Sequence, residues 1–312
     1  MKKELVAFLR CPACFTELTL KTDVCENGEI LSGQLICPHQ HQFQIQDGVP
    51  RFVDPSTTLD SRTREVFGSE WTTFGAYNAP NLALMTDDLD RNFFSGRLVL
   101  DAGCGGGRHS QELKTVWGAK TVIGVDFSNA VLTAVQRTKD HAGIHIVQAS
   151  IYDLPFEKNF FGVVFCLGVL QHLPDPRGAV STLVECLKPG GRVVLWVYKK
   201  SLRKQLLEIP RTITKRLPVS LQHVFSWVAA VLFYPGVLAF RHLRLPLPSH
   251  FREYAKHDWS IYRTDWYDRL SAPMTAYYDE DEIACWFSEE SLENVQISSY
   301  KDFFIRGIGT KF

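Results

Sequence analysis

Leu98-Val-Leu-Asp-Ala-Gly-Cys-Gly-Gly-Gly-Arg108 is the stretch of this chain that decides its fold. It predicts a buried strand, then a glycine-rich turn, then the start of a helix. Glycines in such a turn allow positive φ angles and let a ligand approach the backbone closely. The pattern alone indicates a nucleotide-binding α/β fold without saying which one, because many such folds use a glycine triplet.

Apolar runs and helical patterns alternate along the chain as far as Tyr198. The strand-like runs cover 97–103, 121–127, 144–150, 161–168 and 190–198. The helical patterns between them cover 109–117, 128–139 and 175–188. Strands that are buried on both faces and separated by helices predict βαβ units. We therefore expect an α/β fold with a Rossmann-like, doubly wound and mostly parallel sheet.

Two carboxylates narrow the choice of ligand. Asp101 closes the first strand, where a carboxylate would repel the pyrophosphate of a nicotinamide cofactor. Asp126 ends the next strand, 126 − 107 = 19 residues after the last loop glycine. A carboxylate at that place can accept both ribose hydroxyls of a nucleoside. A nucleoside without pyrophosphate, with an amino group for Asp101 to recognise, describes S-adenosylmethionine.

Residues 97–198 closely resemble the class I S-adenosylmethionine-dependent methyltransferases, especially the ubiquinone/menaquinone-biosynthesis-like group. The matching motifs are VLDAGCGGGRHS, GVDFS, LPF, FGVVFCLGVLQHLPDP and LKPGGRVVLWVY. The resemblance implies that Asp101, Gly103, Gly105 and Gly107 contact the methionine end of the cofactor and that Asp126 binds its ribose. It also implies that Phe127, Ser150 and Ile151 lie at the adenine and that Leu167 lies near the sulfonium. Ser150 and Gly162 stand where the family often has Asp, which leaves an inactive, cofactor-binding scaffold as an alternative.

The sulfonium of this cofactor is already an activated electrophile, so a base is needed only for a protonated acceptor. His172, in VLQHLPD, follows a strand whose carboxyl end should face the cofactor, and it is our candidate base. The alternative is a histidine that only hydrogen-bonds a loop. Trp266-Tyr-Asp268-Arg269 and Tyr277-Tyr278 form either a substrate lid or an aromatic packing segment.

Cys11-Pro-Ala-Cys14 and Cys37-Pro-His-Gln-His41 have the spacing of two metal-binding turns. Two residues between cysteines let a turn aim both sulfurs at one ion, and Cys11, Cys14, Cys37 and His41 make a plausible Zn²⁺ site. The alternative is a set of reduced cysteines that happen to fall in pairs. Cys25 and His39 are rival ligands that we expect to be free and exposed.

Residues 4–54 resemble the zinc ribbons of small methyltransferase-activating proteins, through CPAC, CPHQH and the DGVP turn. CPHQHQF also resembles the zinc module of bacterial ribosomal-RNA guanine methyltransferases. In both families the ribbon is joined to a methyltransferase or binds one. The N-terminal apolar run, Leu5 to Leu9, is shorter than the roughly 7–15 residues of a secretory signal, so we expect a cytoplasmic protein with reduced thiols.

The chain has equal numbers of basic and acidic residues, 34 of each, but residues 201–250 carry seven basic and one acidic side chain, a net +6. Within this segment, 219–240 is almost entirely apolar, yet Gln222, His223 and a break at Pro235-Gly236 argue against a membrane span. Three interpretations stay open. They are a packed structural insertion, a helix at a membrane surface or over an apolar substrate, and a contact with the RNA backbone.

The expected organisation has five parts. They are a zinc-ribbon domain (1–55), a helical approach segment (56–96) with anchors Phe67, Trp71, Phe74 and Tyr77, a methyltransferase core (97–198), a basic apolar helical insertion (199–250) and a C-terminal completion (251–312). We predict a cytoplasmic methyltransferase for a small, apolar or lipid-like metabolite, with peripheral membrane contact through 201–250. An RNA base methyltransferase is the alternative, disfavoured because residues 1–60 carry five basic and eight acidic side chains, a net −3. A non-catalytic, zinc-dependent partner protein is the third interpretation of its function.

Overall fold

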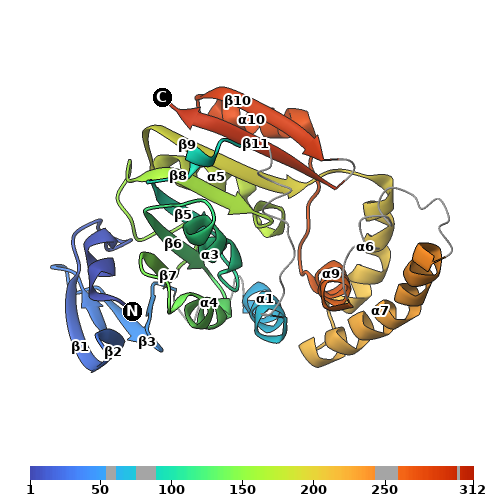
Figure 1. The fold of residues 1–312 in the computed structure, drawn as a ribbon, viewed down its shortest axis with the longest axis horizontal. Coiled ribbons are helices and arrows are strands. Elements are labelled where there is room, and N and C mark those ends of the chain that lie inside the picture. The colour runs from blue at the N-terminus through green and yellow to red at the C-terminus, as the bar shows by residue number, and fades with distance from the viewer. Residues whose placement is uncertain (54–60, 75–88, 243–258, 301–302) are drawn as a thin grey trace.

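One twisted sheet organises the protein (Figure 1). The computed structural model describes residues 1–53, 61–74, 89–242, 259–300 and 303–312. Within these ranges, eleven strands form a single sheet in the order β1-β2-β3-β4-β7-β6-β5-β8-β9-β11-β10. The alternating apolar residues of the central strands supply its two buried faces, so the sheet lies in the core of the molecule.

The centre of the sheet is parallel, as predicted. It consists of β5 (Leu98–Ala102), β6 (Thr121–Asp126), β7 (Ile144–Gln148), β8 (Phe161–Leu167) and β9 (Leu187–Tyr198). The chain order reverses between β5 and β8, which creates a switch point at the carboxyl ends of these strands. β11 (Phe304–Lys311) then pairs antiparallel with β9, and β10 (Leu292–Tyr300) pairs antiparallel with β11 at the edge of the sheet.

Helices cover both faces of this central sheet. α3 (Arg108–Thr115) packs Leu113 against one face, together with Val99, Val122 and Phe165. α5 (Pro176–Glu185) and α10 (Glu280–Glu289) pack against the opposite face, where Leu100 and Ile123 point. α4 (Ala130–Thr138) lies beside α3 and contacts β7. The Rossmann-like, mostly parallel sheet predicted from the sequence is therefore confirmed.

The cysteine-bearing N-terminal segment continues the same sheet. A short 3-10 helix (Lys3–Phe8) precedes β1 (Thr19–Glu26), β2 (Glu29–Ile36), β3 (Gln42–Gln46) and β4 (Val49–Arg51). β4 pairs in parallel with β7 through Arg51 and Gln148, so the predicted DGVP turn region contains a strand that joins the two parts. The five domain boundaries given above stay predictions.

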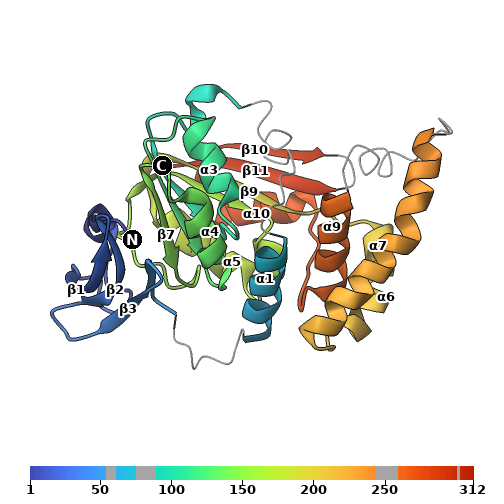
Figure 2. The same cartoon turned by 60° about the horizontal axis from the view of Figure 1, so that its bottom comes forward.

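Helices on the other side of the molecule frame the carboxyl ends of the strands (Figures 1 and 2). They are α1 (Ser61–Thr73), α6 (Leu202–Thr214), α7 (Val219–His242) and α9 (Trp259–Ser271). α9 packs against α6, α7 and α1, and α7 is the outermost of the set in Figure 2. Tyr77, one of the predicted anchors, lies outside the described residues.

One expectation about this helical region was wrong, and one of its helices was not predicted. We expected Pro235-Gly236 to break the helix, but α7 continues to His242. Pro235 is on an exposed side of the helix, where a carbonyl that loses its donor can turn to solvent. We also did not predict α9, whose apolar and charged residues follow no clear helical stripe. No helix in the described ranges combines the length and apolar character needed to cross a bilayer.

Candidate functional site

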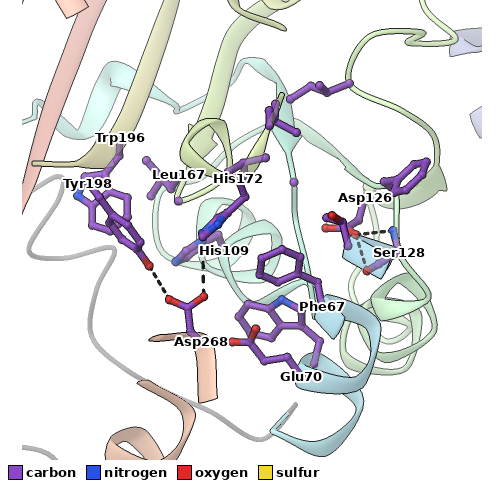
Figure 3. Close-up of a pocket in the computed structure, with 18 of the residues that line it drawn as sticks. Phe67, Glu70, His109, Asp126, Ser128, Leu167, His172, Trp196, Tyr198 and Asp268 are labelled. Atoms are coloured by element: carbon purple, nitrogen blue, oxygen red, sulfur yellow. Dashed lines mark hydrogen bonds and ion pairs between the residues drawn. The ribbon is translucent and has the colours of Figure 1, made fainter. Parts of the chain in front are cut away.

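A cavity of about 410 Å³ lies at the switch point of the sheet (Figure 3). The residues that follow β5, β6, β7 and β8 form its floor, including Gly103, Phe127, Ser150 and Gly168. α1 and α9 supply the walls, and Trp196 and Tyr198 of β9 close one end. Its volume is within the range of roughly 300–1,000 Å³ that is typical of small-molecule sites.

Asp126 is held rigidly at one end of this cavity. Its Oδ2 accepts a hydrogen bond of 2.9 Å from the amide of Gly105, and its Oδ1 accepts bonds from the amide and hydroxyl of Ser128 at 2.8 and 2.7 Å. Burial raises the pKa of Asp126, while the bonds from Ser128 and Gly105 oppose the shift. A carboxylate has about four lone-pair sites, so one remains for a ligand hydroxyl.

The loop after Asp126 is tied to the N-terminal segment. The side-chain amide of Gln148 donates to the carbonyls of Phe127 and Ser128, both at 3.2 Å. Arg51 in turn donates to Oε1 of Gln148 at 2.7 Å, and Gln148 is almost fully buried. The guanidinium of Arg64, on α1, lies 4.8 Å from the centre of the Phe127 ring. These contacts connect β4, β7 and α1 to the one loop that carries Asp126 and Phe127.

The predicted cofactor residues divide into two groups. Seven of the ten predicted cofactor and catalytic residues line the cavity, namely Gly103, Asp126, Phe127, Ser150, Ile151, Leu167 and His172. Asp101, Gly105 and Gly107 do not line it. Asp101 is 2% exposed and accepts a 2.6 Å bond from the hydroxyl of Ser110, and burial raises its pKa to about 7.

Gly105 and Gly107 have packing reasons for lacking a side chain. Both have positive φ, 51° and 77°. A Cβ atom on Gly105 would come within 2.7 Å of the Trp71 indole, and one on Gly107 would lie 2.9 Å from Ala134. The glycine loop therefore lets α1 and α4 approach the loop backbone.

His172 lies at the other end of the cavity, on a short 3-10 helix (Leu170–His172) after β8. Its Nδ1 is 2.8 Å from the carbonyl oxygen of Met274, which can only accept, so Nδ1 carries the hydrogen. Nε2 then keeps its lone pair and lies 4.0 Å from Oδ1 of Asp268, while Tyr198 donates to Oδ2 of Asp268 at 2.7 Å. Burial lowers the pKa of His172, although Asp268 opposes this shift, and the lowered pKa favours the neutral imidazole.

Several cavity residues were missed by the sequence reasoning or given another role. Glu70, His109, Trp196, Tyr198 and Arg211 line the cavity and were not singled out. No local signal marks them, since they come from α1, α3, β9 and α6. Of the proposed lid, Asp268, Arg269 and Tyr277 line the cavity, whereas Trp266 stacks on Phe233 of α7 and Tyr278 packs on Trp286.

The four predicted metal ligands lie together in the N-terminal segment, far from the cavity. The ligand atoms of Cys11, Cys14, Cys37 and His41 are all within 4.8 Å of one another. The sulfurs of Cys14 and Cys37 are 3.7 Å apart, and Nδ1 of His41 is 3.4 Å from the sulfur of Cys11. A tetrahedral ion with Zn–S bonds of about 2.3 Å separates two sulfurs by about 3.8 Å, so the cluster fits zinc. The rival ligands Cys25 and His39 are exposed and outside it.

Comparisons with known proteins place this site in a methyltransferase domain. Residues 100–195 match the family described as "Methyltransferase domain". The mitochondrial ubiquinone biosynthesis O-methyltransferase of Schizosaccharomyces pombe is 32% identical over 141 residues, which cover 42% of this chain and 49% of that protein. The tRNA U34 carboxymethyltransferase of Cellvibrio japonicus is 36% identical over 120 residues, 37% of this chain and 34% of that protein.

A structural likeness covers more of the chain. A chain from the complex between the Haloferax volcanii Trm112 methyltransferase activator and a methyltransferase shares 14% identity with a TM-score of 0.48, over 79% of this chain and 96% of that one. With an identity and a TM-score this low, the likeness supports no inference about function. The chain spans about half or less of the length of the first two curated relatives above. The matches show an S-adenosylmethionine-dependent methyltransferase domain and leave the substrate open, because one relative is named for ubiquinone biosynthesis and the other for tRNA U34.

Proposed function

We propose that this protein transfers a methyl group from S-adenosylmethionine to a small, apolar or lipid-like metabolite. The observation that carries the proposal is one continuous cavity with Asp126 at one end and the His172–Asp268 pair at the other (Figure 3). Phe127, Ile151 and Leu167 give the cavity apolar surfaces between these two polar ends. Such a layout suits a ligand with a polar nucleoside end and a second molecule that meets it near His172.

The cofactor fits the residues of the Asp126 end. The free lone-pair site of Asp126 would hold the ribose, and Phe127 and Ile151 would enclose the adenine, with Ser150 beside it. When bound, S-adenosylmethionine supplies an electrophilic methyl group. The protein then has to hold the acceptor in line behind that methyl group and exclude water.

His172 is proposed to remove a proton from the acceptor. Because Nδ1–H is bound to the carbonyl of Met274, Nε2 is free to accept a proton on the cavity side. Asp268 would then stabilise the imidazolium that forms, and Tyr198 fixes the carboxylate of Asp268 by a hydrogen bond. The Tyr198 and His172 rings also meet edge to face, with 5.7 Å between their centres, which restricts the orientation of the imidazole.

Labelled S-adenosylmethionine tests the acceptor class directly. The protein is incubated with labelled cofactor and, separately, with total RNA, a lipid extract and polar metabolites. We expect label in the lipid extract or in an apolar metabolite fraction, and its loss with the Asp126→Ala variant. Label in RNA would replace this proposal by the RNA alternative, which the tRNA-modifying relative favours. No transfer to any fraction, with intact cofactor binding, would favour the inactive scaffold.

We also propose that Cys11, Cys14, Cys37 and His41 hold one Zn²⁺ as a structural ion. All four positions of a tetrahedral site are supplied by the chain, which is the pattern of structural rather than catalytic zinc. Because the segment that holds the cluster is small, a metal would contribute to its folding. Its position beside β1–β4 gives it no part in the chemistry at His172.

The outer face of α7 is proposed to contact an anionic membrane surface. Leu221, Val224, Phe225, Val228, Val231 and Leu232 are 39–70% exposed and occupy one stripe of about 120° along the helix. The polar residues Gln222 and Ser226 are instead fully buried. An apolar outside and a polar inside is the reverse of an ordinary surface helix.

The basic residues that flank this stripe favour an anionic membrane as the surface that it contacts. No acidic residue occurs between Glu208 and Glu253, and this interval contains six basic residues, namely Arg211, Lys215, Arg216, Arg241, Arg244 and Arg252. An apolar stripe with basic flanks is typical of helices that lie in the lipid interface. Sedimentation with anionic and zwitterionic vesicles tests this, and binding that survives Phe225→Ser, Val228→Ser and Leu232→Ser together would contradict it.

A further inference from the structure

A buried carboxyl group faces the cavity. Glu70, on α1, is 6% exposed and lines the cavity on the side of Asp268 (Figure 3). In the described part of the chain, its side chain makes no hydrogen bond or ion pair. A buried carboxylate that is not hydrogen-bonded is costly, and such groups are usually paired. Glu70 therefore requires an explanation.

The charges around Glu70 increase this cost. Burial raises its pKa well above the usual range, and the negative charges of Asp268 and Asp265 raise it further. Two of the guanidinium groups that line the cavity pair with other carboxylates. Arg269 pairs with Asp265 and Arg211 pairs with Glu208. A raised pKa favours the uncharged acid, and a cation bound beside Glu70 and Asp268 would favour the charged carboxylate of Glu70.

Aromatic rings surround the same space. Phe67, Trp71 and Tyr198 line the cavity, and the Phe67 ring meets the His172 ring edge to face with 5.0 Å between their centres. Aromatic faces attract cations, and they do so more strongly where water is excluded. Carboxylates combined with aromatic walls favour an ammonium group over a neutral polar group.

A metal ion fits this space less well. In the described ranges, Cys11, Cys14, Cys37 and His41 are the one set that brings three or more candidate ligand atoms together. Glu70, Asp265 and Asp268 are close enough to influence each other's charge but do not converge on a point. An organic cation, which spreads its charge over a larger volume, matches this spacing better than Mg²⁺ with its bonds of about 2.1 Å.

We propose that the His172 end of the cavity is a subsite for an ammonium group, held by Glu70 and Asp268. This inference rests on the proposed function in one respect, that the cavity binds cofactor and acceptor together. The charges that act on Glu70 come from Asp268 and Asp265 and not from Asp126, which places it at the acceptor end. The ammonium group therefore belongs to the acceptor, and the amino group of the cofactor itself is the other source.

Calorimetry with a matched pair of probes tests the subsite. The probes are 3,3-dimethylbutylammonium and 3,3-dimethyl-1-butanol, which differ in the ammonium and hydroxyl groups alone. Each is titrated into the full-length protein saturated with S-adenosylhomocysteine. We expect the ammonium probe to bind at least tenfold more tightly than the alcohol. The Glu70→Gln variant should lose most of this difference, because the amide keeps the shape of the side chain without its charge.

Glu65→Gln is the matched control on the same helix. Glu65 is exposed and pairs with Arg62, so its replacement should leave both probe affinities unchanged. The melting temperature of Glu70→Gln should be equal to or higher than that of the wild type, since an unpaired buried carboxyl is removed. A folded Glu70→Gln protein therefore separates loss of the subsite from loss of structure.

The outcomes also separate the two sources of the ammonium group. If the ammonium probe binds only without S-adenosylhomocysteine, and Glu70→Gln weakens the binding of that molecule, the subsite holds the amino group of the cofactor. Equal binding of both probes to the wild type, with unchanged affinity of Glu70→Gln for S-adenosylhomocysteine, overturns the subsite. Failure of the wild type to bind S-adenosylhomocysteine at all would instead contradict the proposed function.

Discussion

Replacement of Asp126 by alanine should weaken the binding of S-adenosylhomocysteine by about 10- to 150-fold. The carboxylate makes three internal hydrogen bonds, to Gly105 and twice to Ser128, which use three of about four lone-pair sites. A ribose hydroxyl would take the remaining site. A hydrogen bond to a charged group contributes about 1.5–3 kcal/mol, and each 1.4 kcal/mol corresponds to a factor of about ten in affinity.

Calorimetry on purified variants measures this effect. Asp126→Asn keeps the size of the side chain but loses its charge, and it should fall between the wild type and Asp126→Ala. Ser128→Ala is the control, because it removes the hydroxyl that donates to Asp126 and accepts from the amide of Ala130, and it leaves the amide of Ser128 in place. Its effect on affinity should be smaller than that of Asp126→Ala, because the lost hydroxyl acts on the ligand only through Asp126.

Thermal denaturation checks that the variants are folded. A folded Asp126→Ala protein with wild-type affinity for S-adenosylhomocysteine would refute the assignment of Asp126 to the ribose. An equal loss in Ser128→Ala and Asp126→Ala would show that Asp126 acts only by shaping the loop.

Three further predictions concern the contacts around the site. Arg51→Met removes the donor to Gln148, and calorimetry should show about two- to tenfold weaker binding of S-adenosylhomocysteine. The control Asp47→Asn breaks only an exposed ion pair with Arg51 and should leave this binding unchanged. Cys14→Ser should abolish the zinc content measured by elemental analysis, from about one ion per chain, while Cys25→Ser retains it. His172→Asn should lower kcat by roughly 10²–10⁴-fold without changing cofactor affinity. In the wild type, kcat should fall only as the pH drops below 6.5, because burial lowers the pKa of His172 and protonation removes the base.

The sign of the His172 effect on stability follows from the same shift. A histidine whose pKa is lowered by folding binds fewer protons in the folded than in the unfolded state. Its contribution to stability is therefore present above the unfolded value of 6.5 and is lost as the pH falls toward the folded pKa. Asp268 and the carbonyl of Met274 limit the loss, while Arg211 increases it.

Local sequence patterns were sufficient to predict the site residues that lie at the end of a strand or directly after it. Asp126, Phe127, Ser150 and Leu167 each end a strand or follow one by a few residues, so the order of the strands already brings them to one edge of the sheet. The metal ligands were equally accessible, because the spacing within each pair fixes a turn that points both side chains the same way. Here a few consecutive residues determine the geometry.

Other assignments depended on distant contacts. Gly105 and Gly107 were assigned to the cofactor because they belong to the glycine loop, but Trp71 and Ala134 occupy the space beside them. Trp71 comes from a helix more than 30 residues earlier in the chain. No pattern within the loop indicates which of its glycines faces a ligand and which faces a neighbouring helix.

The sequence by itself determined the parallel sheet, the glycine loop, the acidic residue after the second strand of the core and the spacing of the metal ligands. Tertiary structure decided what closes the cavity: Glu70 of α1 and Asp268 of α9 are almost 200 residues apart, yet both line the cavity that contains His172. It also decided that the polar side of α7 is buried and its apolar side exposed. Helical periodicity shows which side chains share a face, but only packing against a particular neighbour decides which face turns inward.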